Sequence, residues 1–171
     1  IFVLRNDENY GPSYSRNRGL GHVQAEFVNF LDSDDFITEY AFSKALDLFK
    51  KHKEIDVASM PIYYFGSRRG GHSLNYKFEK TQVINLYEKP EYIQLSGASS
   101  FFRFSALQNY KFEEGLRVSE DPLLINQMLL DNPNIGFLDG CAYYYRKHND
   151  QTSLIGSSTN HKSYFCIHPF E

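Results

Sequence analysis

A short apolar run that ends in three carboxylates constrains this chain more than any other feature. Residues 25–31 read Ala-Glu-Phe-Val-Asn-Phe-Leu, and Asp32, Asp34 and Asp35 follow at once. Such a run is typical of a buried strand. The carboxylates therefore fall at the carboxyl end of the strand, which is the edge where open α/β sheets bind ligands. The sequence predicts a ligand site built on a sheet.

Two interpretations of this acidic cluster remain open. Three like charges in four residues repel one another, and a divalent cation would neutralise them while leaving coordination positions for a phosphate. Asp-rich turns also occur as solvated connections and as helix N-caps. An EF-hand calcium loop fits poorly, because residues 36–38 (Phe-Ile-Thr) replace the glycine and the alternating oxygen ligands of that motif.

Composition limits the class of protein. With 171 residues, of which 42% are hydrophobic, the chain has the size and core material of one globular domain. Its formal charge of -3 gives no electrostatic case for a nucleic-acid partner. Cys141 and Cys166 have no metal-ligand or redox spacing, so a reducing cytoplasm is the default location. No apolar stretch approaches the roughly 20 residues that cross a bilayer.

Strand and helix patterns alternate along the chain and predict one α/β domain. We expect strands at residues 1–4, 25–31, 56–65 and 135–145, and a loop that enters a strand within residues 94–104. We expect helices at residues 12–18, at 39–53 with Thr38 as the N-cap, and at 120–131 with Ser119 as the N-cap. The Gly- and Arg-rich residues 66–73 are expected to form a loop, which either contacts an anionic acceptor or is merely exposed and flexible.

Two further groups of polar residues complement the acidic cluster. Glu120 and Asp121 stand at a predicted helix start, and Arg146 and His148 follow the last predicted strand. Ordinary explanations exist for both groups. Carboxylates in a first helical turn are common capping residues, and basic residues in loops are normally solvated.

In their order, these segments resemble family 2 glycosyltransferases of the GT-A fold. Residues 9–20 (Asn-Tyr-Gly-Pro-Ser-Tyr-Ser-Arg-Asn-Arg-Gly-Leu) resemble the family's Asn-x-Gly…Arg-Asn-x-Gly segment. Residues 32–35 (Asp-Ser-Asp-Asp) resemble its Asp-x-Asp signature, and residues 119–121 (Ser-Glu-Asp) its Glu-Asp motif. Residues 144–153 are similar to its Tyr-Arg-x-His…Ser segment, and residues 56–104 to transferase domains of teichoic-acid and capsular-polysaccharide enzymes.

For the fold, the resemblance implies a Rossmann-like nucleotide-diphospho-sugar transferase domain, with three α/β/α layers and a mixed sheet. It begins partway through the family pattern, so we expect a fragment that lacks the first βαβ half and its base-binding residues. Residues 1–155 are expected to form a partial GT-A domain with the metal, donor-diphosphate and acceptor half. Residues 156–171 are expected to start a C-terminal extension.

For function, the resemblance implies inverting transfer of a hexosyl-type sugar from a nucleotide-diphosphate sugar, expected to be a UDP-sugar. The implied acceptor is a cell-surface polysaccharide or teichoic acid, the implied cofactor is Mg²⁺ or Mn²⁺, and the implied location is cytoplasmic or peripheral at the inner membrane face. One alternative is a catalytically silent carbohydrate-binding or polymer-binding module of a larger polymerase, and inactivity of the isolated fragment also stays open. A metal-dependent phosphatase would explain the acidic cluster but not the later Arg146 and His148.

The resemblance also implies roles for individual residues. Asp121 is the expected catalytic base. Glu120, Ser99 and Ser100 are expected to contact the acceptor or to support the site. The donor would be bound by Arg16, Asn17, Asp32, Asp34, Arg146 and Ser153. The metal ion would be held by Asp34, Asp35 and His148.

Overall fold

A mixed five-stranded sheet forms the centre of the protein. The structure is a computed structural model that describes residues 2–93, 96–116, 118–148 and 165–167. The strand order is β2 (Phe27–Asn29), β8 (Ser100–Arg103), β4 (Val57–Ser59), β9 (Asn134–Phe137) and β7 (Gln82–Asn85). Strands β4 and β9 run parallel, whereas the other neighbours are antiparallel.

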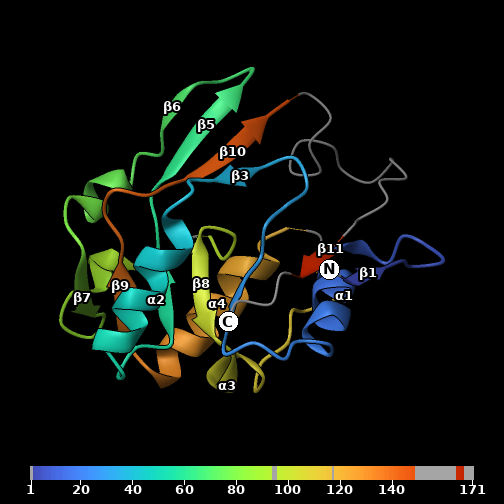
Figure 1. Cartoon of the computed structure of the whole chain (residues 1–171), viewed down its shortest axis with the longest axis horizontal. Coiled ribbons are helices and arrows are strands. Elements are labelled where there is room, and N and C mark those ends of the chain that lie inside the picture. Colours follow the sequence, from blue (N-terminus) through green and yellow to red (C-terminus); the bar gives the residue numbers. More distant parts are fainter. Residues whose placement is uncertain (1, 94–95, 117, 149–164, 168–171) are drawn as a thin grey trace.

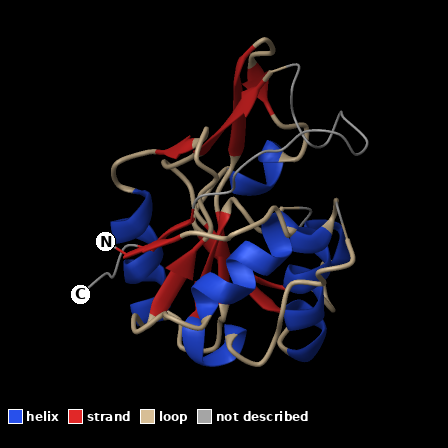
Figure 2. Cartoon of the chain, turned by 90° about the vertical axis from the view of Figure 1, so that its right-hand side faces the viewer, coloured by secondary structure: helices blue, strands red, loops and turns tan. Residues whose placement is uncertain are grey.

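Helices cover both faces of this sheet, which confirms the predicted three-layer α/β/α arrangement. Alternate residues of one strand point to opposite faces, and accordingly Phe101 packs in the core beneath α2 (Ala41–Lys51) while Phe102 packs beneath α4 (Glu120–Asp131). Figure 2 shows helices flanking the strands of this sheet. The remaining helical segments are α1 (Gly11–Leu20), α3 (Phe104–Leu107), and the 3-10 turns η1 (Asn75–Phe78) and η2 (Pro90–Tyr92).

A second sheet extends away from the first. Its order is β3 (Phe36–Ile37), β10 (Tyr143–Lys147), β5 (Ile62–Gly66) and β6 (Gly70–Gly71) (Figure 1). Strands β10 and β5 are parallel. Strand β3 directly follows the acidic cluster, so the second sheet borders the predicted ligand site.

Two predicted strands were wrong in the same way, because each is divided between the two sheets. Residues 56–65 form β4 and β5, which are separated at Pro61, a residue without the N–H that a continuous ladder needs. Residues 135–145 form β9 and β10, which are separated by a turn where Gly140 has φ 68°. Both chain segments therefore cross from the large sheet to the small one.

The three predicted helices are found as α1, α2 and α4, whereas α3 was not predicted. The expected capping bonds are absent. The hydroxyl of Thr38 accepts a hydrogen bond from the backbone N–H of Ala142, 3.0 Å away, instead of capping α2. Ser119 is the N-cap residue of α4, yet it has a left-handed φ of 66° and its side chain makes no capping bond. The expectation that residues 66–73 form only a loop was also incomplete, because they include β6.

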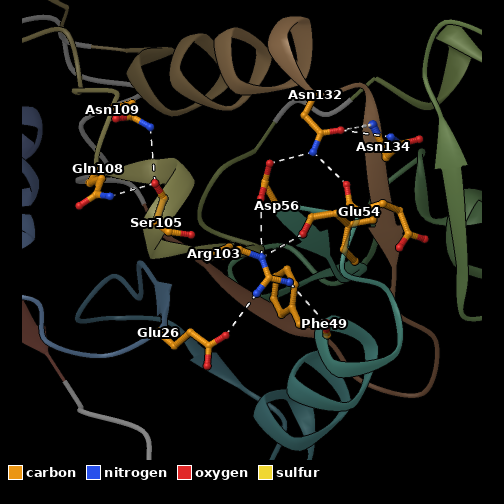
Figure 3. A network of polar contacts seen from close by, with 11 residues as sticks. Glu26, Phe49, Glu54, Asp56, Arg103, Ser105, Gln108, Asn109, Asn132 and Asn134 are labelled. Carbon is orange, nitrogen blue, oxygen red and sulfur yellow. Dashed lines mark hydrogen bonds and ion pairs between the residues drawn. The ribbon is translucent and has the colours of Figure 1, made fainter.

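A polar network joins the end of α4 to the sheet (Figure 3). Arg103 pairs with Glu26 at 3.2 Å and approaches Asp56 at 3.7 Å. Asn132, which ends α4, donates a hydrogen bond of 2.8 Å to Asp56. Because this network lies at the end of α4 opposite Glu120, it anchors the helix that carries the predicted catalytic motif.

Strand β1 (Phe2–Leu4) pairs antiparallel with β11 (Phe165–Ile167). These three residues are the part of the expected extension, 156–171, that the structure describes. The domain boundary at residue 155 lies outside the described residues and stays a prediction.

Replacement of Gly136 in β9 by alanine should destabilise the protein. A Cβ atom there would lie 2.5 Å from Cδ2 of Leu48 and 3.0 Å from Cδ1 of Ile55, so α2 would be pushed from the sheet. We expect a loss of about 1–3 kcal/mol in the free energy of unfolding, measured by urea denaturation. Gly21→Ala is the control, since Gly21 has φ -64° and its Cβ would have only one contact, at 3.4 Å. Equal urea midpoints for the two variants would contradict the packing described here.

Candidate active site

A buried arginine joins the two acidic motifs. Nη1 of Arg16 donates to Oε1 of Glu120 at 2.6 Å, and Nη2 contacts Oδ1 of Asp32 at 3.1 Å. Burial alone would lower the pKa of Arg16, but the charges of Asp32 and Glu120 outweigh it and hold that pKa above its usual value. One guanidinium thus holds the acidic loop after β2 beside the start of α4.

Helix α1 positions this arginine through local sequence features. Pro12 lies in the first turn, where its missing N–H costs nothing. The Arg16 guanidinium also lies 5.3 Å from the ring centroid of Phe112. Both polar atoms of the Asn17 amide bind the backbone of Phe112, which fixes that ring in place. Asn17 therefore supports Arg16, and its amide is fully used inside the protein.

Asp35 is held by two donors from β10. Its Oδ2 accepts a hydrogen bond from the Tyr143 hydroxyl at 2.5 Å, and its Oδ1 accepts one from the backbone N–H of Arg146 at 2.7 Å. Burial raises the pKa of Asp35 to about 7, although both hydrogen bonds act to lower it. Asp35 consequently fastens the acidic loop to β10.

Asp34 and His148 form the more accessible pair of the cluster. Nε2 of His148 lies 3.0 Å from Oδ2 of Asp34, and both side chains remain about one third exposed at 36% and 37%. A ligand can reach this pair, and it can also reach Asp32, whose side chain is 42% exposed. Arg146, two residues before His148, is also exposed.

Asp121 lies in the first turn of α4 and faces a glycine loop. Its Oδ2 accepts a hydrogen bond of 2.8 Å from the backbone N–H of Gly97, and a Cβ on Gly97 would lie 3.0 Å from the Cβ of Asp121. Burial raises the pKa of Asp121, while the Gly97 N–H and the charge of Arg16 act to lower it. Such a carboxylate is a stronger proton acceptor than an exposed one.

The other predicted acceptor or support residues lie inside the protein. Glu120 is bound to Arg16, and Ser99 is only 2% exposed. The Ser100 hydroxyl lies 2.6 Å from that of Ser59 and donates to the carbonyl of Ser96. The geometry of these three residues suits support of the site rather than direct contact with an acceptor.

The structure brings together most of the predicted site residues. Arg16, Asp32, Glu120 and Asp121 form one group, and Asp34, Asp35, Arg146 and His148 form a second group linked to it through the acidic loop. Ser153 lies outside the described residues. Sequence reasoning missed Tyr143, Gly97 and Phe112. Gly97 carried a weak signal as the glycine of a small-residue segment, whereas Tyr143 resembled any other strand tyrosine.

The residues present offer two ligands to a metal ion. Asp34 offers a carboxylate, which is the ligand type that suits Mg²⁺ and Mn²⁺, and His148 adds an imidazole. Both oxygens of Asp35 already accept hydrogen bonds. Within the part of the chain that the structure describes, no group of three His, Cys, Asp or Glu side chains is placed to hold a metal. A bound ion would therefore need oxygen atoms from a substrate or water.

These features agree with a family comparison, and the chain belongs to glycosyl transferase family 2. The model of that family, described as "Glycosyl transferase family 2", matches residues 1–111. The match includes the Arg16 segment, the acidic cluster and the Gly97 loop.

Two of the relatives are named for minor teichoic acid biosynthesis. The chain is 37% identical over 155 residues to minor teichoic acid biosynthesis protein GgaA of Bacillus subtilis, covering 88% of this chain and 35% of the relative. It is 32% identical over 164 residues to GgaB of the same organism, covering 95% of this chain and 18% of the relative. The chain thus spans about a third or less of these relatives.

A solved structure confirms the GT-A fold. Staphylococcus aureus TarS 1-349, solved in complex with UDP-GlcNAc, superposes with a TM-score of 0.73 and 27% sequence identity. The match covers 86% of this chain and 42% of the TarS chain. Across the described residues, no helix is both long and apolar enough to span a membrane.

Replacement of Arg16 by methionine should strongly destabilise the protein. The variant leaves the buried Glu120 carboxylate and the half-exposed Asp32 carboxylate without their common partner. Because an unpaired buried charge is costly, we expect a loss of about 3 kcal/mol in unfolding free energy, measured with urea. Arg18→Met on the exposed side of α1 is the control and should cost less than about 1 kcal/mol. If both variants unfolded at the same urea concentration, the ion pairs of Arg16 with Asp32 and Glu120 would not be important for stability.

Proposed function

We propose that this chain carries the diphosphate and catalytic part of an inverting glycosyltransferase that transfers a hexosyl-type sugar from a UDP-sugar to a teichoic-acid-type acceptor. The observation that carries the proposal is the Arg16 clamp, by which we mean the two ion pairs of Arg16 with Asp32 and Glu120. These ion pairs join the acidic loop to the first turn of α4, which also carries Asp121. Family membership supports sugar transfer. The relatives named for teichoic acid biosynthesis and the TarS complex with UDP-GlcNAc support the choice of acceptor and donor.

In the proposed reaction, Asp121 acts as the general base. Its ionised carboxylate takes the proton from an acceptor hydroxyl as the hydroxyl oxygen forms a bond to the anomeric carbon of the donor. The bond between that carbon and the diphosphate oxygen breaks on the opposite face, so the configuration inverts. The transition state has the cation-like character of glycoside cleavage. The Gly97 N–H and the first turn of α4 hold Asp121 in one orientation.

The second group of residues would stabilise the leaving diphosphate. Arg146 is exposed and can bind phosphate oxygens with its planar fork. Asp34 and His148 would hold Mg²⁺ or Mn²⁺, which supplies positive charge to the diphosphate when bound. Asp35 would keep the loop and β10 in register. The direct participation of Asp35 in metal binding and the role of Ser153 stay predictions, as does a cytoplasmic or peripheral membrane location.

Replacement of Asp121 by asparagine should strongly lower the rate of transfer and spare donor binding. The amide keeps the shape of the side chain but cannot accept the proton, and loss of a general base lowers rates about a hundredfold or more. The rate is measured as nucleotide release with acceptor present, and donor binding is measured by calorimetry with a UDP-sugar and Mn²⁺.

A matched control for this variant is Asp131→Asn at the opposite end of α4, where the carboxylate accepts a hydrogen bond from the Tyr110 hydroxyl. It should retain the wild-type rate. Normal turnover by Asp121→Asn would overturn the assignment of the base.

The pH dependence of transfer should reflect the environment of Asp121. A base must be ionised, so kcat/KM should fall as the pH is lowered through the pKa of Asp121. Burial raises that pKa above the ordinary value of 3.8, and the acidic limb should lie correspondingly higher. An acidic limb at the ordinary value in a full pH profile would show that the base is an exposed carboxylate instead.

A further inference from the structure

A group of cations lies on two tyrosine rings of the second sheet. The guanidinium of Arg68 is 4.7 Å from the ring centroid of Tyr64. Nζ of Lys147 is 4.2 Å from the ring centroid of Tyr145 and 5.3 Å from that of Tyr64. Tyr64 and Tyr145 are register partners on the parallel strands β5 and β10. We define Tyr64, Arg68, Tyr145 and Lys147 as the cation–tyrosine cluster.

Backbone contacts fix the turn that presents Arg68. Gly66 has φ 90°, and a Cβ there would lie 2.5 Å from the carbonyl oxygen of Lys147, so only glycine fits. Ser67 donates both its N–H and its hydroxyl to that same carbonyl, at 2.9 and 2.8 Å. Strand β6 then pairs with β5. The turn is thus a defined structure, which argues against the flexible-loop interpretation of residues 66–73.

The cluster concentrates positive charge on the parallel strands β5 and β10 and the turn after β5. Among the described residues, neither Arg68 nor Lys147 forms an ion pair. Burial lowers the pKa of His72, and the charges of Arg68, Lys77 and Lys147 lower it further. Like charges repel, so fold stability alone does not explain why these cations gather, and a bound anion would relieve the repulsion.

The cluster is also directly connected to the candidate active site. Lys147 stands between Arg146 and His148 in the chain, and the backbone N–H of Arg146 donates a hydrogen bond of 2.7 Å to Asp35. Figure 1 shows β5, β6 and β10 side by side in the part of the protein that projects from the large sheet. A long polymer could contact this projection while one of its hydroxyls reaches Asp121.

We propose that the cation–tyrosine cluster binds phosphodiester groups of an anionic polyol-phosphate acceptor and thereby holds the polymer beside the active site. The inference rests on the proposed function for the identity of the acceptor. Arg68 and Lys147 would contact phosphate oxygens, since charge-assisted hydrogen bonds to phosphate are strong. Tyr64 and Tyr145 keep both cations in place. His72 accepts a backbone hydrogen bond at Nδ1, so its neutral ring presents an Nε2–H donor.

The test measures binding of a glycerol phosphate oligomer to the protein by calorimetry, without donor. We expect Arg68→Gln/Lys147→Gln to weaken binding about tenfold and to reduce the dependence of affinity on salt, because fewer counterions are displaced. The matched control is Lys50→Gln/Lys51→Gln, which removes the same charge from the exposed end of α2 and should bind as the wild type does. In transfer assays, the Arg68→Gln/Lys147→Gln variant should have a higher KM for the polymer than the wild type.

Several results would overturn the inference. One is that the wild type does not bind the glycerol phosphate oligomer. Another is that the two double variants bind it equally weakly. A third is that the wild type binds an RNA oligonucleotide more tightly than the glycerol phosphate oligomer. Should the double variant fail to fold by circular dichroism, Arg68→Gln alone, at an exposed position, must still weaken binding. Failure of the proposed function is distinguishable, because it would appear as no UDP-sugar binding while polymer binding through the cluster persisted. Conversely, if the Arg68→Gln/Lys147→Gln variant kept the wild-type transfer rate and the wild-type KM for the polymer, only the inference about the cluster would be overturned.

Discussion

The Arg16 clamp is the interaction on which the arrangement of the site depends. The acidic loop and the start of α4 both carry carboxylates, which would repel one another if brought together alone. A single guanidinium can bind both because its nitrogens point in several directions at fixed angles. Phe112 packs on its face, and Asn17 of the same helix fixes Phe112. The clamp therefore converts two acidic segments, 88 positions apart between Asp32 and Glu120, into one site.

A second constraint comes from the two chain crossings between the sheets. Pro61 and the turn at Gly140 each end a strand of the large sheet and allow the next strand to enter the small one. Strand β10 thereby reaches the acidic loop, where it donates to Asp35 and places His148 against Asp34. The same strand carries Lys147 into the cation–tyrosine cluster. Strand β10 thus contacts the acidic loop, positions His148 beside Asp34 and contributes to the cation–tyrosine cluster.

Burial affects the acidic residues of the site in different ways. It raises the pKa of both Asp35 and Asp121. The oxygens of Asp35 are occupied by Tyr143 and the Arg146 N–H, which suits a structural link. Asp121 is held by the N–H of Gly97 and lies near Arg16, which keeps a basic carboxylate oriented. Asp34 is partly exposed and has His148 as its partner, which suits contact with a ligand.

The sequence by itself determined the fold class, the positions of α1, α2 and α4, and the residues that carry charge. Local periodicity and Pro, Gly and Asn signals mark elements because those preferences act within a few residues. Only the tertiary structure decided that residues 56–65 and 135–145 divide between two sheets, that Asn17 and Ser100 bond inside the protein, and that Tyr143 binds Asp35. It also decided that Thr38 and Ser119 make no capping bonds. These outcomes depend on which distant backbone groups and charges meet, and no local pattern encodes such meetings.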